Sequence, residues 1–101
     1  MNIFEPIWGD EMAMVGGFVS CADGKLLSSF GDFSFNKNES GSFSFTFPTD
    51  SLPIFVATPE DGYQSATVHI GGRGSGYILA HTGYGDGYKD INAFTFIAIW
   101  P

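Results

Sequence analysis

Phenylalanine alternates with small hydroxyl residues between positions 42 and 47, where Ser44 and Thr46 separate Phe43, Phe45 and Phe47. This period of two predicts a β-strand with one buried face and one polar face. Similar short runs lie at residues 12–20, 25–29, 33–36, 54–58, 66–70, 76–82 and 93–100, and no helical apolar period spans ten residues. We therefore expect residues 12–101 to form an all-β domain, an antiparallel β-sandwich of about six to eight short strands.

Turn sequences separate the predicted strands. Asp23-Gly24 predicts a hairpin, because Gly tolerates the positive φ of a type I′ turn. Residues 36–41 are polar and predict a loop, and residues 59–62 (Pro-Glu-Asp-Gly) predict a turn. The glycine-rich residues 71–75 predict a hairpin loop.

The closing segment, residues 93–100, is apolar on both faces after Thr95. A strand with two apolar faces needs cover on both sides, and in so short a chain the second cover has to come from another subunit. We expect one set of side chains to enter the core and the other to face symmetry-related copies, and the pattern leaves open which set does which. The two sets are Phe94, Phe96, Ala98 and Trp100 on one face, and Ile97 and Ile99 on the other.

The chain is acidic and carries few charges. Its 101 residues suit one small domain, and its net charge is −7 with only four basic residues. Such a chain repels phosphate backbones and anionic lipid surfaces, so we expect no nucleic-acid partner. No apolar run approaches the length of about 18 residues that a membrane span needs, so we expect no membrane insertion.

Residues 1–11 combine helix-breaking and apolar residues. Pro6 and Gly9 oppose a helix, yet the segment is too apolar for a free tail. We predict an anchoring arm that docks on a neighbouring chain or a larger assembly, and the alternative is that it folds back on its own domain. The apolar residues of this arm are Ile3, Phe4, Ile7 and Trp8.

The loop at residues 83–90 is the best candidate for ligand binding. Tyr84 and Tyr88 offer flat faces with polar tips, and Asp86 and Asp90 offer acceptors. Sugars present C–H faces to aromatic rings and hydroxyls to carboxylates, and mixtures of Tyr and Gly are typical of adaptable recognition loops. The alternative is a solvated connector.

Two neighbouring loops are predicted to contribute to the same ligand site. Residues 60–64 supply Tyr63, and residues 71–76 supply Arg73. The spacing at residues 83–90 does not match a calcium-binding loop.

No pattern of catalysis or cofactor binding stands out. The glycines at 71–76 match neither dinucleotide nor phosphate-loop spacing. His69, His81 and Cys21 match no metal signature, although a histidine pair across a hairpin, or one histidine triplicated on a threefold axis, remains an alternative. No nucleophile signature or specific carboxylate pair appears, so we expect no enzyme, no cofactor and no metal.

Three segments together resemble a known family. They are the Gly-hydroxyl-Phe alternation at residues 41–47, the run Pro-Ile-Phe-Val-Ala-Thr-Pro at 53–59, and residues 90–101 with their Phe-Thr-Phe-Ile-Ala-Ile-Trp-Pro close. Over residues 14–101 the chain resembles the C-terminal tip domain of bacteriophage tail-fibre and related virion fibre proteins, which are similar to the H-type lectin sandwich. The resemblance implies a homotrimer about a threefold axis, on the virion surface, that attaches to host-surface glycans or receptors.

The chain departs from the fibre pattern in one respect. Only the eleven-residue arm precedes the tip domain, where fibres have a long shaft. A capsid or tail decoration protein of the head-fibre kind, held to other virion proteins by residues 1–11 without binding a receptor, is therefore an alternative. A non-viral H-type lectin is another. The loops share no clear motif with lectins, so no sugar-binding residue is carried over.

Overall fold

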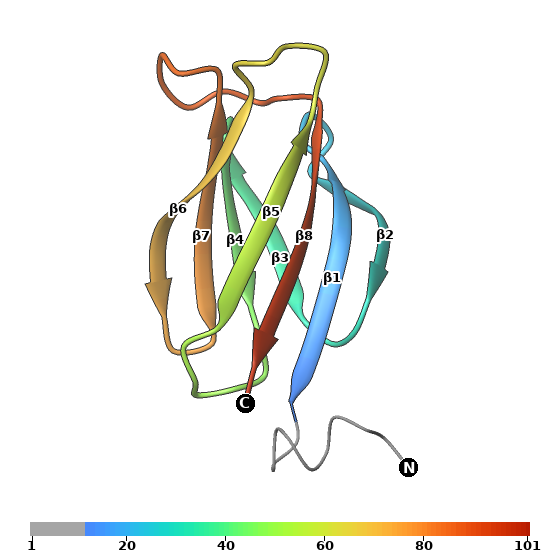
Figure 1. Ribbon diagram of the computed structural model, residues 1–101, viewed down its shortest axis with the longest axis vertical. Coiled ribbons are helices and arrows are strands. Elements are labelled where there is room, and N and C mark those ends of the chain that lie inside the picture. Colours follow the sequence, from blue (N-terminus) through green and yellow to red (C-terminus); the bar gives the residue numbers. More distant parts are fainter. Residues whose placement is uncertain (1–11) are drawn as a thin grey trace.

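The computed structural model describes residues 12–101, which form eight strands and no helix (Figure 1). The strands are β1 (Ala13–Ser20), β2 (Lys25–Phe30), β3 (Ser34–Glu39), β4 (Ser42–Thr46), β5 (Ile54–Glu60), β6 (Thr67–Gly74), β7 (Tyr77–Gly83) and β8 (Ala93–Trp100). Because residues 12–101 contain no helix, none there could span a membrane. The arm predicted at residues 1–11 lies outside the described residues.

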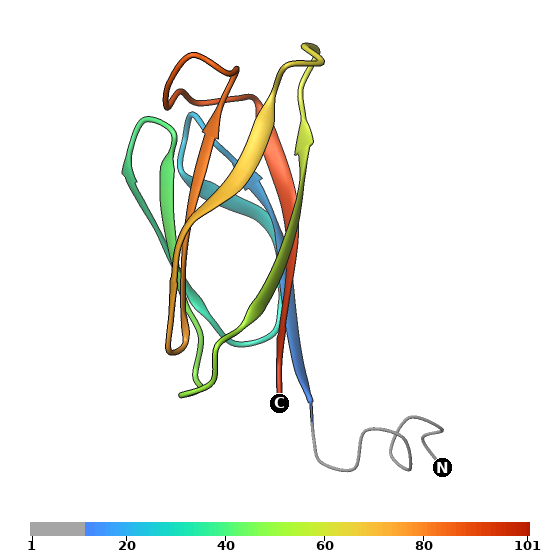
Figure 2. The same ribbon diagram turned by 60° about the vertical axis from the view of Figure 1, so that its left-hand side comes forward.

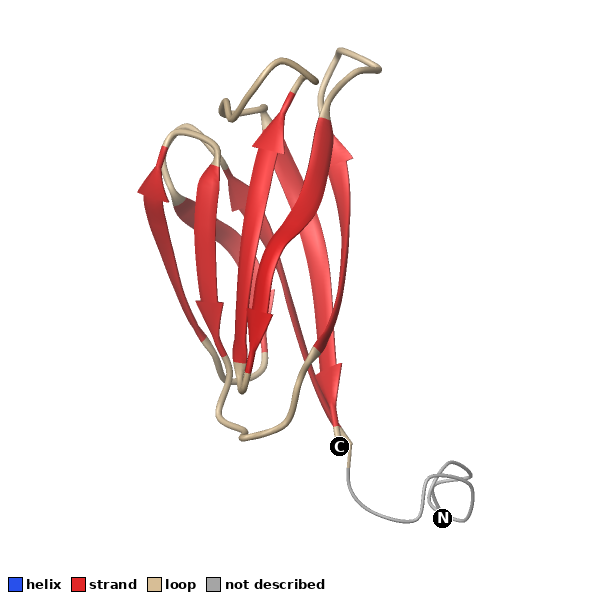
Figure 3. Ribbon diagram, turned by 90° about the vertical axis from the view of Figure 1, so that its left-hand side faces the viewer, coloured by secondary structure: helices blue, strands red, loops and turns tan. Residues whose placement is uncertain are grey.

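The strands form two antiparallel sheets of four strands each, as the sequence predicts for a sandwich. Sheet A has the order β2-β1-β8-β5, and sheet B has the order β3-β4-β7-β6. Figures 2 and 3 show the two layers from the side. The closing strand β8 lies between β1 and β5, so its backbone is paired on both edges.

The inward faces of the two sheets form one core rich in phenylalanine. Phe43, Phe45 and Phe47 of the alternating segment are all buried. The ring of Phe45 lies 4.7 Å from that of Phe96 on the opposite sheet, measured between centroids. The predicted period of two thus places one face of β4 against sheet A.

The closing strand alternates as predicted. Phe94, Phe96, Ala98 and Trp100 point into the core and are buried. Ile97 lies on the opposite face and is 46% exposed, and Ile99 shares that face. The core-facing set is therefore the aromatic one.

A hairpin joins β1 and β2 as predicted at Asp23-Gly24, with Gly24 at φ 65°. The turn is not of type I′, however, because residues 21–24 form a four-residue loop and Asp23 does not have a positive φ. The loop predicted at residues 36–41 is wrong, because β3 continues to Glu39 and the turn shrinks to Ser40 and Gly41. The outward side chains of Asn36 and Asn38 bond to each other at 2.8 Å, so a polar run lies on the solvent side of a strand.

The hairpin loop predicted at residues 71–75 is too long, because β6 continues to Gly74. A bulge between Ile70 and Gly72 lets the strand absorb the glycines. The turn predicted at residues 59–62 begins later, since Pro59 and Glu60 belong to β5. Pro59 is tolerated there because β5 is an edge strand of sheet A.

Candidate functional site

The sandwich has two ends, and five of the six predicted ligand residues lie at one of them. We call this end the tip; it consists of residues 61–66 and 84–92, which follow β5 and β7 (Figure 1). Tyr63, Tyr84, Asp86, Tyr88 and Asp90 belong to it. Arg73 does not, because the β6–β7 turn lies at the opposite end, beside residues 47–51.

That opposite end is also where β1 begins and β8 ends, and we call it the terminal end (Figure 1). The Gly76 amide donates to the Ser51 carbonyl there at 2.8 Å. The strand register explains the separation of Arg73 from the tip. Arg73 pairs with Ile78 near the start of β7, whereas the tip loop leaves from the other end of that strand.

Asp61 joins the two tip segments, although it is not among the ligand residues predicted from the sequence. Its Oδ2 accepts hydrogen bonds from the Tyr84 hydroxyl at 2.7 Å and from the Asn92 amide at 2.8 Å. Its Oδ1 accepts from the Tyr63 amide at 2.9 Å. The only sequence signal was its place in a Pro-Glu-Asp-Gly turn, where Asp commonly bonds to the backbone two residues on.

These hydrogen bonds shift the pKa values of both Asp61 and Tyr84. The Asn92 amide, followed by the Tyr84 hydroxyl and the Tyr63 amide, lowers the pKa of Asp61 because each stabilises the carboxylate. The bond to Asp61 and, to a smaller extent, desolvation raise the pKa of Tyr84 to about 12. At neutral pH the pair is therefore a charged acceptor with a neutral phenol donor.

Tyr63 packs against the Tyr84 ring, which Asp61 holds in place. Its ring meets the ring of Tyr84 edge to face, with centroids 5.8 Å apart and planes at 80°. Tyr63 is 71% exposed, so most of its own ring is open to solvent. Tyr84, in contrast, is half-buried, and its ring is the surface against which the Tyr63 ring packs.

Tyr88 folds back over the outer face of sheet B. The backbone of Lys89 returns to β7 through its bond to Thr82 at 3.0 Å, and Tyr88 forms an isolated bridge with Gly83. Its ring then stacks on His81, with centroids 3.8 Å apart and planes at 4°. Tyr88 remains 54% exposed, so its other face is available.

His81 is held beneath Tyr88 by two further contacts. Its Nδ1 lies 3.3 Å from the Gly41 carbonyl oxygen. A Cβ at Gly71 would lie 2.2 Å from its Cδ2, so only glycine at the β6 bulge leaves room for the ring. His69, directly opposite on β6, has its ring 5.7 Å from that of His81 and is exposed.

Among the residues that the structure describes, the histidine pair gains no further metal ligand. Within residues 12–101, no three His, Cys, Asp or Glu side chains gather into a metal-binding group. His69 and Tyr88, with ring centroids 6.1 Å apart, instead border one aromatic surface.

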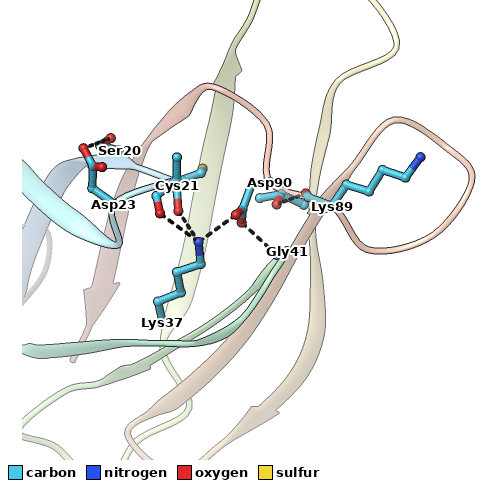
Figure 4. Close-up of polar contacts among 9 residues, drawn as sticks. Ser20, Cys21, Asp23, Lys37, Gly41, Lys89 and Asp90 are labelled. Carbon is cyan, nitrogen blue, oxygen red and sulfur yellow. Dashed lines mark hydrogen bonds and ion pairs between the residues drawn. The ribbon is translucent and has the colours of Figure 1, made fainter.

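Asp90 was predicted to bind a ligand, but its carboxylate is used inside the protein (Figure 4). Oδ2 pairs with Lys37 Nζ at 2.7 Å, and Oδ1 accepts from the Gly41 amide at 2.9 Å. Lys37 Nζ also donates to the carbonyls of Cys21 at 2.7 Å and Ala22 at 3.1 Å. Asp90 therefore ties the tip loop to the β1–β2 and β3–β4 turns.

Asp86 remains at the surface. It pairs with Lys89 at 3.0 Å, and both side chains are more than half exposed. The Lys89 ammonium lowers the pKa of Asp86, so the carboxylate is charged at neutral pH. Of the two aspartates predicted to contact a ligand, Asp86 is the one whose carboxylate faces solvent.

Cys21 is buried beneath the Lys37 cluster. Burial, with a smaller contribution from Asp90, raises the pKa of its thiol to about 12. The thiol is therefore protonated at neutral pH, and a protonated thiol is a poor nucleophile.

Comparisons with protein-family models, with curated proteins and with solved structures found no match for this chain. Proposals about its function therefore rest on the tip and on the surfaces of the two sheets.

Proposed function

We propose that this protein is a non-enzymatic virion attachment protein of the bacteriophage fibre-tip type, a homotrimer that binds host-surface glycans or receptors through its tip. Residues 1–11 would join it to other virion proteins at the particle surface. The observation that carries the proposal is the pair of open aromatic faces, Tyr63 and Tyr88, at the end of the sandwich opposite the start of β1.

The chemistry of the tip suits a neutral polar ligand. Tyr63 and Tyr88 of the tip, together with His69 on the neighbouring strand β6, present exposed rings on which the C–H face of a sugar can stack. Asp86 supplies an exposed carboxylate acceptor for hydroxyls, next to the donor Lys89. Asp61 and Asp90 hold the loops in place, so less conformational entropy is lost on binding.

The position of the tip supports attachment. β1 begins at the terminal end (Figure 1), so an anchor formed by the residues that precede it would join the sandwich at the end opposite the tip. A binding site at the far end from the anchor is what an attachment protein needs.

A decoration protein without receptor binding is the second candidate. The outer face of sheet A favours it, because apolar side chains such as Ile54 and Val56 are exposed there and suit assembly contacts. A non-viral H-type lectin would use the same tip, so its distinction from a virion protein depends on whether the protein copurifies with particles.

A glycan array with the full chain tests the proposal, with Tyr88→Ala and Tyr63→Ala as variants. We expect each to weaken glycan binding about tenfold, since an aromatic contact contributes about 0.5–1.5 kcal/mol beyond its area. Tyr77→Ala is the matched control, because Tyr77 is 37% exposed at the other end of β7. The proposal fails if the wild-type protein binds no glycan or host surface, or if Tyr77→Ala weakens binding as much as Tyr88→Ala.

A further inference from the structure

We propose that the outer face of sheet A is the surface through which copies of this chain associate. The proposal adds to the proposed homotrimer the surface through which its copies meet. This surface does not include the aromatic residues of the closing strand. Phe94, Phe96 and Trp100 are buried in the chain's own core and are closed to a neighbour.

The strand register arranges this outer face in rows across the sheet. Ile54, Ile99 and Met14 are directly paired in the row nearest the terminal end. The next row contains Val56, Ile97 and Gly16, and the Phe30 ring covers Gly16 so closely that a Cβ there would lie 2.6 Å from it. The rows towards the terminal end are thus entirely apolar.

The third row is more polar. Thr58, Thr95 and Phe18 lie across the sheet, with Ser28 beyond them on β2. An open depression of about 160 Å³ lies between this row and the second, lined by Val56, Thr58, Thr95, Phe96 and Ile97. An apolar centre bordered by small hydroxyls and a hollow has the anatomy of a protein interface.

These apolar side chains are exposed in the single chain. Val56 is 63% exposed, Ile54 58% and Met14 56%. On sheet B, the outward positions of β3 and β4 are polar and contain Ser34, Asn36, Ser44 and Thr46. The outer face of sheet A is therefore more apolar than this half of sheet B.

The size of the face fits the centre of an interface. Strands lie about 4.8 Å apart and rise about 3.4 Å per residue, so four strands over six residues cover roughly 400 Å² before side-chain relief. A specific interface needs about 1,000 Å² in total over both partners. Two whole faces in contact supply most of that area. In a trimer each face is divided between two neighbours, so residues at the margins of the sheet contribute to each interface as well.

Charge favours a second copy as the occupant. The only charged residues in the four strands of sheet A are Lys25 and Glu60, each at the tip-side end of its strand. Copies with a net charge of −7 repel one another over acidic surfaces, so they approach most easily through an uncharged face. An apolar face needs no complementary charges on its partner, so several copies can gather it around one rotation axis.

The choice of the outer face of sheet A does not depend on the proposed function. The relative orientation of the copies does depend on it. If the rotation axis runs along the strands, all tips point the same way and all chains enter at the terminal end. Several tips on one assembly would then bind a glycan-covered surface with avidity.

The test is the mass of the full chain in solution, by light scattering at micromolar concentration and without glycan. We expect a trimer, and we expect Ile97→Lys and Val56→Lys to raise the dissociation constant at least about tenfold, because each buries an unpaired charge. Tyr77→Lys, on the central strand β7 of sheet B, is the control with the same change in charge. It should keep the wild-type mass.

Several outcomes would overturn the proposal. One is a wild-type protein that stays monomeric at about 100 μM, where an assembly with a dissociation constant of about 1 μM or lower would be mostly formed. Another is an Ile97→Lys variant with unchanged mass. A third is an equal effect of Tyr77→Lys and Ile97→Lys. Dissociation by Trp8→Ser in the full chain, with none by Ile97→Lys, would assign the association to residues 1–11. If Ile97→Lys does not fold, Ile97→Thr replaces it, since Thr95 already occupies this face.

The association of the copies in solution is measured independently of glycan binding. Tyr88→Ala should leave the mass unchanged, so a failed glycan array and a failed association are separate findings.

Discussion

The tip and the terminal end of the sandwich are held by different kinds of contact. At the tip, the carboxylates of Asp61 and Asp90 accept hydrogen bonds from backbone and side chains of several loops. At the terminal end, backbone groups bond to one another, as in the Phe47 amide to the Gly76 carbonyl and the Gly76 amide to the Ser51 carbonyl, both at 2.8 Å. Within residues 12–101, the side chains that bond to this backbone are the uncharged hydroxyls of Thr49 and Ser75.

The difference has consequences for sequence freedom and for pH. Carboxylates titrate and backbone amides do not, so the tip is the acid-sensitive end. A loop fixed by one aspartate also leaves other side chains of the loop exposed to solvent, as those of Tyr63 and Asp86 are. The terminal end depends instead on a backbone conformation that few residues can adopt.

The largest effect is expected for Gly76→Ala at the terminal end. Gly76 has φ 61°, and a Cβ there would lie 2.3 Å from the Thr49 carbonyl oxygen. The left-handed conformation alone costs about 1–2 kcal/mol, so we expect at least about 2 kcal/mol less free energy of unfolding with the clash included. Urea denaturation measures it. Gly62→Ala at the tip is the control, because its Cβ would meet nothing within 4 Å, and equal effects would contradict the comparison.

Asp90→Asn is expected to have the next largest effect. The half-buried carboxylate bonds to the Lys37 ammonium and the Gly41 amide, and hydrogen bonds to charged groups contribute about 1.5–3 kcal/mol. We expect a loss of free energy of unfolding in that range by urea denaturation. Asp86→Asn serves as the matched variant, since its exposed ion pair should contribute at most about 1 kcal/mol. A larger loss for Asp86→Asn would show that the roles of the two aspartates are reversed.

The smallest effect concerns Asp61 and acid. Folding lowers the pKa of this carboxyl from its ordinary value of 3.8, so its contribution to stability is present above that value and is lost as pH falls through the lower folded pKa. We expect the urea midpoint to drop less between about pH 5 and about pH 2 in Asp61→Asn than in the wild-type protein. An identical drop of the urea midpoint in both proteins would show that Asp61 does not contribute to the acid sensitivity of the tip.

Much of the fold was predictable because strand alternation is local. Phe43, Phe45 and Phe47 face inward as their spacing indicates, and Gly24 turns the first hairpin as Asp-Gly predicts. The loop predicted at residues 36–41 was wrong because polarity there reflects the outward face of strand β3.

The candidate site was predictable only in part. Tyr63, Tyr84 and Tyr88 do share one end, whereas Arg73 lies at the other because strand direction assigns each loop to an end. Asp61 was missed and Asp90 was given a ligand role, since the partners of a carboxylate come from distant parts of the chain. Asp90 lies 53 positions from Lys37 and 49 from Gly41.

The sequence by itself determined the strands, the inward phenylalanines and the two faces of the closing strand, because each depends on neighbours two residues away. Only the tertiary structure decided that Phe94, Phe96 and Trp100 are core, that Ile97 and Ile99 lie on an exposed apolar face, and which aspartates are structural. Those outcomes depend on the order of strands in the two sheets, which brings together residues far apart in the chain.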